Sequence, residues 1–124
     1  MWAGMKRKQI TKAERQQVYQ KYDGHCAYCG IPMEYKDMQV DHLIPVESWN
    51  PVPEEQVYTM ENYMPACRMC NHYKRANSLE GWRHMLETIP EKLERDSYIY
   101  RVGVRYGNVR PEPKKIVFYF ENRR

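Results

Sequence analysis

Two short cysteine pairs constrain this chain more than any other feature of its sequence. Each pair has the spacing C-x-x-C, and a long excursion separates them; the members are Cys26, Cys29, Cys67 and Cys70. A two-residue gap lets both sulfurs of a tight turn face one ion, and two such turns complete a closed tetrahedral shell. The chain has 4 cysteines, so none is left over. The spacing therefore predicts a structural Zn²⁺ ion that ties the first pair to the second.

Disulfide bonds and a thioredoxin-like redox site are the other uses of paired cysteines. A redox site needs only one C-x-x-C pair, and disulfides are disfavoured in a reducing compartment. The chain is expected to be cytoplasmic, because it has no apolar run close to the roughly 20 residues that span a bilayer. The basic residues 6–8 are not followed by the apolar stretch of a secretory signal. Zinc is therefore the favoured use of the cysteines.

The chain is short enough to benefit from such a staple. Its 124 residues are predicted to form one domain, 1–124, and a domain of this size buries a limited fraction of its surface. The formal net charge of +4 is weak evidence for a polyanionic partner. By charge alone, solvated surface positions are the simpler explanation of the basic residues.

The segment before the first cysteine pair predicts a helix. Residues 11–22 carry apolar positions at helical spacing. Thr11 followed by Glu14 fits a capping box, in which each side chain satisfies the other residue's backbone N–H. The helix is expected to end at the Asp-Gly that follows.

The excursion between the cysteine pairs predicts two short strands with a loop between them. The strands are expected at 38–41 and 62–66, and the second contains a proline that confines it to a sheet edge. Residues 43–58 carry three prolines and predict an irregular loop, which at this length is usually functional. A helix is expected to begin at Asn71 or just after it.

The last third of the chain changes its apolar period. Positions 79–89 keep helical spacing, but the tyrosines and valines of 98–106 alternate with a period of two. This alternation predicts a strand that pairs with 116–120 in a C-terminal β-hairpin, with a loop at 107–113. Its tyrosines and arginines could stack on nucleic-acid bases, but packing against the domain is the preferred interpretation.

Three polar groups lie in or next to the excursion and carry the candidate chemistry. Asp41 and His42 place a carboxylate beside an imidazole, Asn62 precedes the second cysteine pair, and Asn71 follows it directly. Each has a simpler explanation when taken alone. An Asp-His pair is often a surface hydrogen bond, Asn62 could be a turn residue, and Asn71 could cap a helix.

Taken together, the order of these motifs resembles the HNH endonuclease family, the ββα-metal nucleases. The order is C-x-x-C, D-H-x-x-P, E-N-x-x-P and C-x-x-C-N-x-x-K, and it covers 24–76. The chain looks like the small free-standing members found in phages and mobile elements. The resemblance implies an α+β fold, in which a ββα-metal finger is stapled by the four-cysteine zinc site and flanked by the N-terminal helix and the C-terminal hairpin.

The resemblance also implies roles for particular residues. His42 is expected to be the general base that activates water, a task that suits an imidazole titrating near neutral pH. Asp41 and Asn71 are expected to hold a catalytic Mg²⁺ or Mn²⁺ ion, since hard ions prefer oxygen ligands. Asn62 is expected to hold the loop that carries the base. Lys74 and Arg75 are expected to contact phosphates.

One position departs from the family name, which implies a final histidine. This chain has Asn71 there, a form that also occurs in the family and accompanies Mg²⁺ use, with His72 next to it. His72 is an alternative ligand, but its side chain is expected to point about 100° away around the helix. Asp41 and His42 raise a second difficulty, because successive strand residues point to opposite faces. They can share a site only if the strand ends there.

These expectations lead to a metal-dependent DNA endonuclease that nicks duplex DNA and leaves 5′-phosphate and 3′-hydroxyl ends. Its partners are expected to be DNA and a phage packaging or other DNA-processing protein. The alternative is a non-catalytic zinc module that binds nucleic acid or protein, which would have no use for Asp41, His42 and Asn71 together. A nuclease toxin or defence effector would use the same chemistry.

Overall fold

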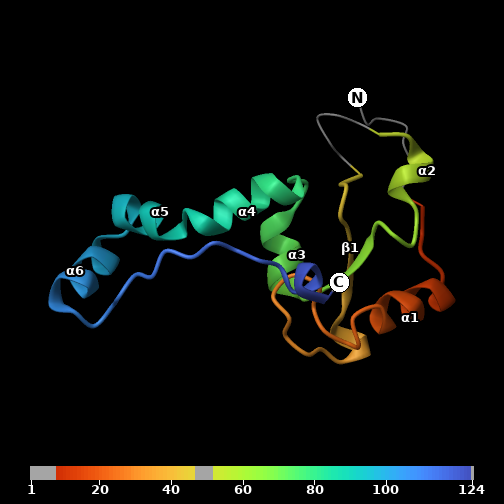
Figure 1. Cartoon of the computed structure of the whole chain (residues 1–124), viewed down its shortest axis with the longest axis horizontal. Helices are drawn as coiled ribbons and strands as arrows, with labels where there is room; N and C mark the ends of the chain where they lie inside the picture. The colour runs from red at the N-terminus through yellow and green to blue at the C-terminus, as the bar shows by residue number, and fades with distance from the viewer. Residues whose placement is uncertain (1–7, 47–51, 124) are drawn as a thin grey trace. The chain divides into compact units, whose positions relative to one another are not determined.

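The computed structural model describes residues 8–46 and 52–123 (Figure 1). They form two compact units, the first comprising 8–79 with 117–123 and the second Glu80–Ile116. The first unit contains both cysteine pairs and every candidate catalytic residue. No helix in the described part of the chain is long and apolar enough to cross a membrane.

The first helix, α1, spans Lys12–Gln20 and has the predicted capping box. The Thr11 hydroxyl accepts a hydrogen bond from the Glu14 backbone N–H at 3.1 Å, and the Glu14 carboxylate accepts one from the Thr11 N–H at 2.9 Å. Val18 is fully buried and packs in a small core with Met38 and Tyr63. This core fixes α1 against the sheet.

The excursion between the cysteine pairs forms the two predicted strands, each shifted by one residue at its start. The 3₁₀ helix η1, Tyr35–Asp37, leads into β1, Gln39–His42, which pairs antiparallel with β2, Tyr63–Ala66. In this register Asp41 lies opposite Met64 and His42 opposite Tyr63. The sheet has only these two strands among the described residues, so both are edges and Pro65 is tolerated.

The predicted loop at 43–58 is partly helical where it is described. A one-turn helix, α2, spans Glu54–Val57, and residues 47–51 lie outside the described part of the chain. The next helix, α3, spans Arg68–Lys74 and begins three residues before the predicted start at Asn71. It begins early because the Cys67 sulfur accepts a hydrogen bond from the Cys70 N–H and so caps the helix. The order β1, β2, α3 is the expected ββα arrangement.

The second unit is helical throughout its regular elements. It contains most of α4, Leu79–Glu87, and all of α5, Ile89–Asp96, and α6, Tyr98–Tyr106. Pro90 lies in the first turn of α5, where its missing N–H is tolerated. The helical period predicted for 79–89 is confirmed, with a short break between α4 and α5.

The predicted C-terminal β-hairpin is wrong, because 98–106 is the helix α6 and no strand is found among the described residues at 107–118. The Ser97 side chain caps α6 at its start, and Gly107, with φ of 81°, ends it in the left-handed conformation. A helix satisfies its own backbone groups, whereas a strand here would need a partner that the proline-containing segment after it does not provide.

The end of the chain returns to the first unit. The predicted second hairpin strand at 116–120 is instead extended chain leading into the 3₁₀ helix η2, Tyr119–Arg123. The Tyr119 N–H donates to the Tyr28 carbonyl at 3.0 Å, and the Phe120 N–H donates to the Ala27 carbonyl at 2.8 Å. These bonds pair the segment with the turn of the first cysteine pair.

Candidate functional site: a cysteine cluster beside an Asp-His-Asn cavity

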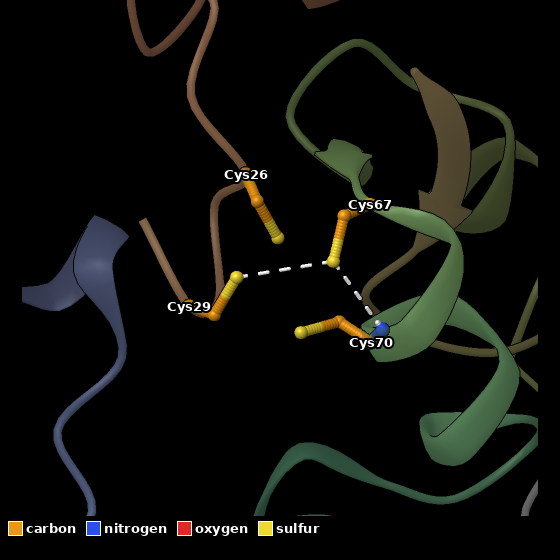
Figure 2. A group of neighbouring side chains, drawn as sticks. All are labelled: Cys26, Cys29, Cys67 and Cys70. Atoms are coloured by element: carbon orange, nitrogen blue, oxygen red, sulfur yellow. Dashed lines mark hydrogen bonds between the residues drawn. The ribbon is translucent and has the colours of Figure 1, made fainter. Parts of the chain in front are cut away.

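The four cysteines come together as their spacing predicts (Figure 2). Their sulfur atoms all lie within 4.8 Å of one another, and the Cys29 and Cys67 sulfurs are 3.8 Å apart. A tetrahedron with metal–sulfur bonds of about 2.3 Å has edges of about 3.8 Å. The donor set and its dimensions therefore fit one tetrahedral metal ion held by thiolates.

The turn formed by residues 26–30, called here the first knuckle, has its shape because Gly30 adopts a backbone conformation that suits glycine. Its φ is 81°, in the left-handed region, and its N–H donates to the Cys26 carbonyl at 2.9 Å. A Cβ at this position would lie 2.7 Å from the Tyr119 ring. The glycine after the second cysteine thus lets the turn close while the C-terminal segment packs on it.

The thiols differ in how readily they lose their protons. A hydrogen bond from Cys70 lowers the pKa of Cys26 to about 4. Burial raises the pKa of Cys29 to about 11. The hydrogen bond to Cys26, followed by burial, also raises the pKa of Cys70. A metal ion that binds all four sulfurs must therefore displace the protons that Cys29 and Cys70 otherwise hold near neutral pH.

Asp41 lies at the centre of a buried polar group next to this cluster. Its side chain is 8% exposed, and the atom Oδ2 accepts a hydrogen bond from the Tyr28 hydroxyl at 2.5 Å. The same Oδ2 lies 3.0 Å from Nζ of Lys74. Burial, followed by the negative charge of Asp41, raises the pKa of Tyr28. Its hydroxyl therefore remains a neutral donor.

The position of Lys74 corrects the expectation that it contacts phosphate. Its side chain is 0% exposed, and the ammonium donates to the His42 carbonyl at 3.1 Å besides pairing with Asp41. A buried charge requires a partner of opposite sign, and Asp41 supplies it. Lys74 is thus part of the support of the site. Arg75, the next residue, is exposed.

His42 is the last residue of β1 and is half-buried between two tyrosines. Its ring meets those of Tyr58 and Tyr63 edge to face, with centroids 5.6 Å and 5.4 Å away. These contacts hold the imidazole plane. Because β1 ends at His42, the alternation of strand faces does not continue past this residue.

A cavity of about 520 Å³ connects the candidate residues of the sheet with those of α3. Five polar side chains contribute to its lining: Asp41, His42, Asn71, His72 and Arg75. The neighbouring Asp41 and His42 therefore reach one site, which the sequence left open.

Asn71 is oriented by a residue that the sequence did not single out. Its Nδ2 donates to Oε1 of Gln39 at 2.7 Å, and this bond leaves the amide oxygen as the atom able to face a cation. His72 is exposed and lines the same cavity from the next position of α3. Both residues remain candidate ligands by position.

Asn62 is buried behind the loop that follows His42. Its Oδ1 accepts from the Ile44 N–H at 2.7 Å, and its Nδ2 donates to the carbonyls of Ile44 at 3.0 Å and Val57 at 2.8 Å. All its polar atoms are thus directed at main-chain groups. The structure places it against the loop that it was expected to hold. Asn62 does not line the cavity that Asp41, His42 and Asn71 share.

Tyr28 was missed by the sequence reasoning, as was Gln39. A tyrosine inside a C-x-x-C turn carries no signal of its own, since its partner Asp41 is 13 residues away. Gln39 lies two residues before Asp41 on β1 and therefore on the same face of the strand. That spacing was the available signal for Gln39.

Two strands followed by a helix, a cluster of four cysteines and an Asp-His pair at a strand end are features that the chain shares with HNH nucleases. Residues 26–77 match the family model described as HNH endonuclease. The match includes all four cysteines and the whole cavity described above.

The chain is also similar to parts of larger known proteins. The chain is 25% identical over 112 residues to the CRISPR-associated endonuclease Cas9 of Corynebacterium diphtheriae, a match that covers 86% of this chain and 10% of that protein. The crystal structure of the Type II-C Cas9 enzyme from Actinomyces naeslundii is similar in fold. It has a TM-score of 0.50, 23% sequence identity, and coverage of 65% of this chain and 8% of that one. The chain thus spans about a tenth of the length of these relatives.

Proposed function

We propose that this nuclease is a divalent-metal-dependent DNA endonuclease that nicks duplex DNA. The observation that carries the proposal is the shared cavity of Asp41, His42 and Asn71, in which a carboxylate, an imidazole and an amide come from two different elements. A phosphodiester is anionic, so its cleavage needs an activated water and stabilisation of the developing charge. This combination of side chains supports both tasks.

Asp41 and Asn71 are the proposed ligands of the catalytic ion. An oxygen donor set suits Mg²⁺ or Mn²⁺, and such an ion would polarise the phosphoryl oxygen and stabilise the leaving oxygen. His72 is the second candidate for the α3 ligand. The closed sulfur shell suits a structural Zn²⁺ that does not take part in the chemistry.

His42 is the proposed general base. It would take the proton of the attacking water while Tyr58 and Tyr63 keep its ring in place. Asn62 would position the loop that follows His42, and Arg75 would bind a phosphate next to the scissile bond. By resemblance to the family, the products carry 5′-phosphate and 3′-hydroxyl ends. Residence in the cytoplasm and action with a further DNA-processing protein belong to the same proposal.

A plasmid assay tests the proposal. Supercoiled plasmid is incubated with the zinc-loaded chain and Mg²⁺ or Mn²⁺, in parallel with His42→Ala and His84→Ala variants of matched zinc content. We expect the parent and His84→Ala, which alters an exposed histidine of α4, to produce nicked circles. His42→Ala should be slower by about 100-fold or more. The proposal fails if the parent does not nick or if His42→Ala nicks at the parent rate.

A non-catalytic zinc module is the competing function. It predicts that DNA or protein binding survives in His42→Ala, Asp41→Asn and Asn71→Ala while no variant, nor the parent, cuts. If the parent cuts and all three variants keep their zinc but do not cut, the result would instead support the enzyme.

A further inference from the structure

We infer that Tyr28 and Lys74 are positioning residues that fix the Asp41 carboxylate so that a divalent ion binds its Oδ1 atom alone. This inference rests on the proposed metal-binding role of Asp41. It assigns a task to two buried groups that do not reach the cavity themselves. Neither residue lines the cavity that Asp41, His42 and Asn71 share.

The contacts of the carboxylate are asymmetric. Oδ2 accepts the Tyr28 hydroxyl at 2.5 Å and lies 3.0 Å from Nζ of Lys74. Among the described residues, no hydrogen bond or ion pair is found at Oδ1. The side chain is 8% exposed and contributes to the cavity lining, so the oxygen without a contact is the one left for a ligand there.

Two donors on one oxygen fix the orientation of the carboxylate before an ion arrives. A freely turning carboxylate could bind through either oxygen or through both. Here rotation of the Asp41 side chain would break the bonds to Tyr28 and Lys74, and these two donors are buried and would be left unpaired. Metal ligands held by outer partners in this way bind more tightly than unsupported ones.

Each of the two donors lies inside or close to one of the cysteine pairs. Tyr28 lies between Cys26 and Cys29, inside the first pair, and Lys74 follows Cys70 by four residues on α3, about one helical turn. Both donors are therefore within a few residues of a sulfur ligand. An ion bound by the four cysteines would fix both turns and, through them, the two groups that hold Asp41.

Manganese binding without DNA tests the inference, because it does not depend on turnover. Mn²⁺ is titrated into zinc-loaded protein, and free Mn²⁺ is followed by electron paramagnetic resonance. The test variant is Tyr28→Phe, which removes only the hydroxyl. The matched control is Tyr19→Phe, which removes a tyrosine hydroxyl bonded to the Met33 carbonyl at 2.6 Å.

We expect Tyr28→Phe to weaken Mn²⁺ binding by about tenfold or more, since outer partners of ligands have effects of that size. Tyr19→Phe should bind as the parent does, and both variants should keep their zinc. In the cleavage assay, excess Mn²⁺ should restore most of the rate of Tyr28→Phe. Equal Mn²⁺ affinities of Tyr28→Phe and Tyr19→Phe would overturn the inference.

Lys74 gives a second test whose sign is informative. If its ammonium acted only as a charge next to a metal ligand, Lys74→Met would tighten Mn²⁺ binding by removing electrostatic repulsion. If it positions Asp41, the same variant should bind Mn²⁺ more weakly. Should Lys74→Met not fold, as judged by zinc content and circular dichroism, the result for Tyr28→Phe decides the inference.

Asp41→Asn separates this inference from the function on which it rests. If Asp41→Asn binds Mn²⁺ as tightly as the parent, the proposed metal site itself is wrong, and so is the inference. If Asp41→Asn abolishes binding while Tyr28→Phe leaves it unchanged, only the inference is wrong.

Discussion

The side chain of Asn62 forms two hydrogen bonds with the main chain of Ile44, one through each of its amide atoms. Oδ1 accepts from the Ile44 N–H at 2.7 Å, and Nδ2 donates to the Ile44 carbonyl at 3.0 Å. The paired residue lies two positions after His42. The Asn62 side chain, just before β2, therefore holds the main chain that follows the end of β1.

This closure predicts that Asn62→Ala impairs cleavage without loss of zinc. Releasing Ile44 should let His42 shift, and a displacement of about 1 Å in a catalytic group can reduce the rate by about 100-fold. The buried main-chain groups left unpaired should also lower stability by about 1–3 kcal/mol. Plasmid nicking and urea unfolding measure the two effects. Asn108→Ala, at an exposed position of the second unit, is the control, and equal rates for the two variants would contradict the prediction.

The buried pair of Lys74 and Asp41 predicts a large loss of stability when one partner is removed. Lys74→Met leaves a carboxylate with a single remaining donor in a site that is 8% exposed, and breaking such pairs costs about 3–5 kcal/mol. The double variant Lys74→Met/Asp41→Asn removes the charge and should recover part of the loss. Lys36→Met breaks an ion pair with Glu34 in which both side chains are largely exposed. This variant should leave the free energy of unfolding almost unchanged. Urea unfolding of the zinc-loaded variants is the measurement.

Metal binding at the cysteine cluster should strengthen as pH rises. Burial raises the pKa of Cys29 to about 11, and the hydrogen bond to Cys26 raises that of Cys70, so these thiols hold protons at pH 7. Cys26, with a pKa lowered to about 4, is already a thiolate. The ion must displace the protons of Cys29 and Cys70, and each one displaced changes the affinity by about tenfold per pH unit.

The stability that the ion contributes follows the same sign, because thiolates are required for binding. This contribution to stability is therefore lost as pH falls and increases as pH rises. The pKa values of Cys26 and Cys29 place the change between about pH 4 and about pH 11. Competition with a chromophoric zinc chelator at pH 6, 7 and 8 measures the slope. A zinc affinity independent of pH would be inconsistent with thiols that hold protons in the metal-free chain.

Gly30 and Gly107 form a matched pair for a stability test. Both have φ of 81°, so an alanine at either position carries the strain of the left-handed conformation, about 1–2 kcal/mol. A Cβ at Gly30 would also lie 2.7 Å from the Tyr119 ring, whereas one at Gly107 would meet nothing within 4 Å. We expect Gly30→Ala to lower the thermal midpoint more than Gly107→Ala and to weaken zinc binding. A larger effect at Gly107 would contradict this reading of the first knuckle.

The sequence and the fold disagree most clearly over 98–106. Alternating tyrosines and valines predicted a strand, but Tyr98, Val102 and Tyr106 are also spaced by four and lie on one face of α6. A period of two and a helical period can both be found in a segment this rich in apolar residues. Capping by Ser97 and the left-handed Gly107 favoured the helix.

The sequence by itself determined the local features, because they depend on residues close together in the chain. The spacing of the cysteine pairs, the capping box of Thr11 and Glu14, and the order of the motifs along the chain are of this kind. They sufficed to predict the four-cysteine cluster, the ββα order and the similarity to HNH endonucleases.

Only the tertiary structure decided which polar groups meet. Lys74 looked like a surface cation, yet it is buried against Asp41, 33 positions earlier in the chain, and Tyr28 completes the same group. The physical reason is that burial of a charge depends on the fold of the whole unit. The two cysteine pairs lie together in the fold, and Tyr28 and Lys74, which lie in or near them, meet at one oxygen of a single carboxylate.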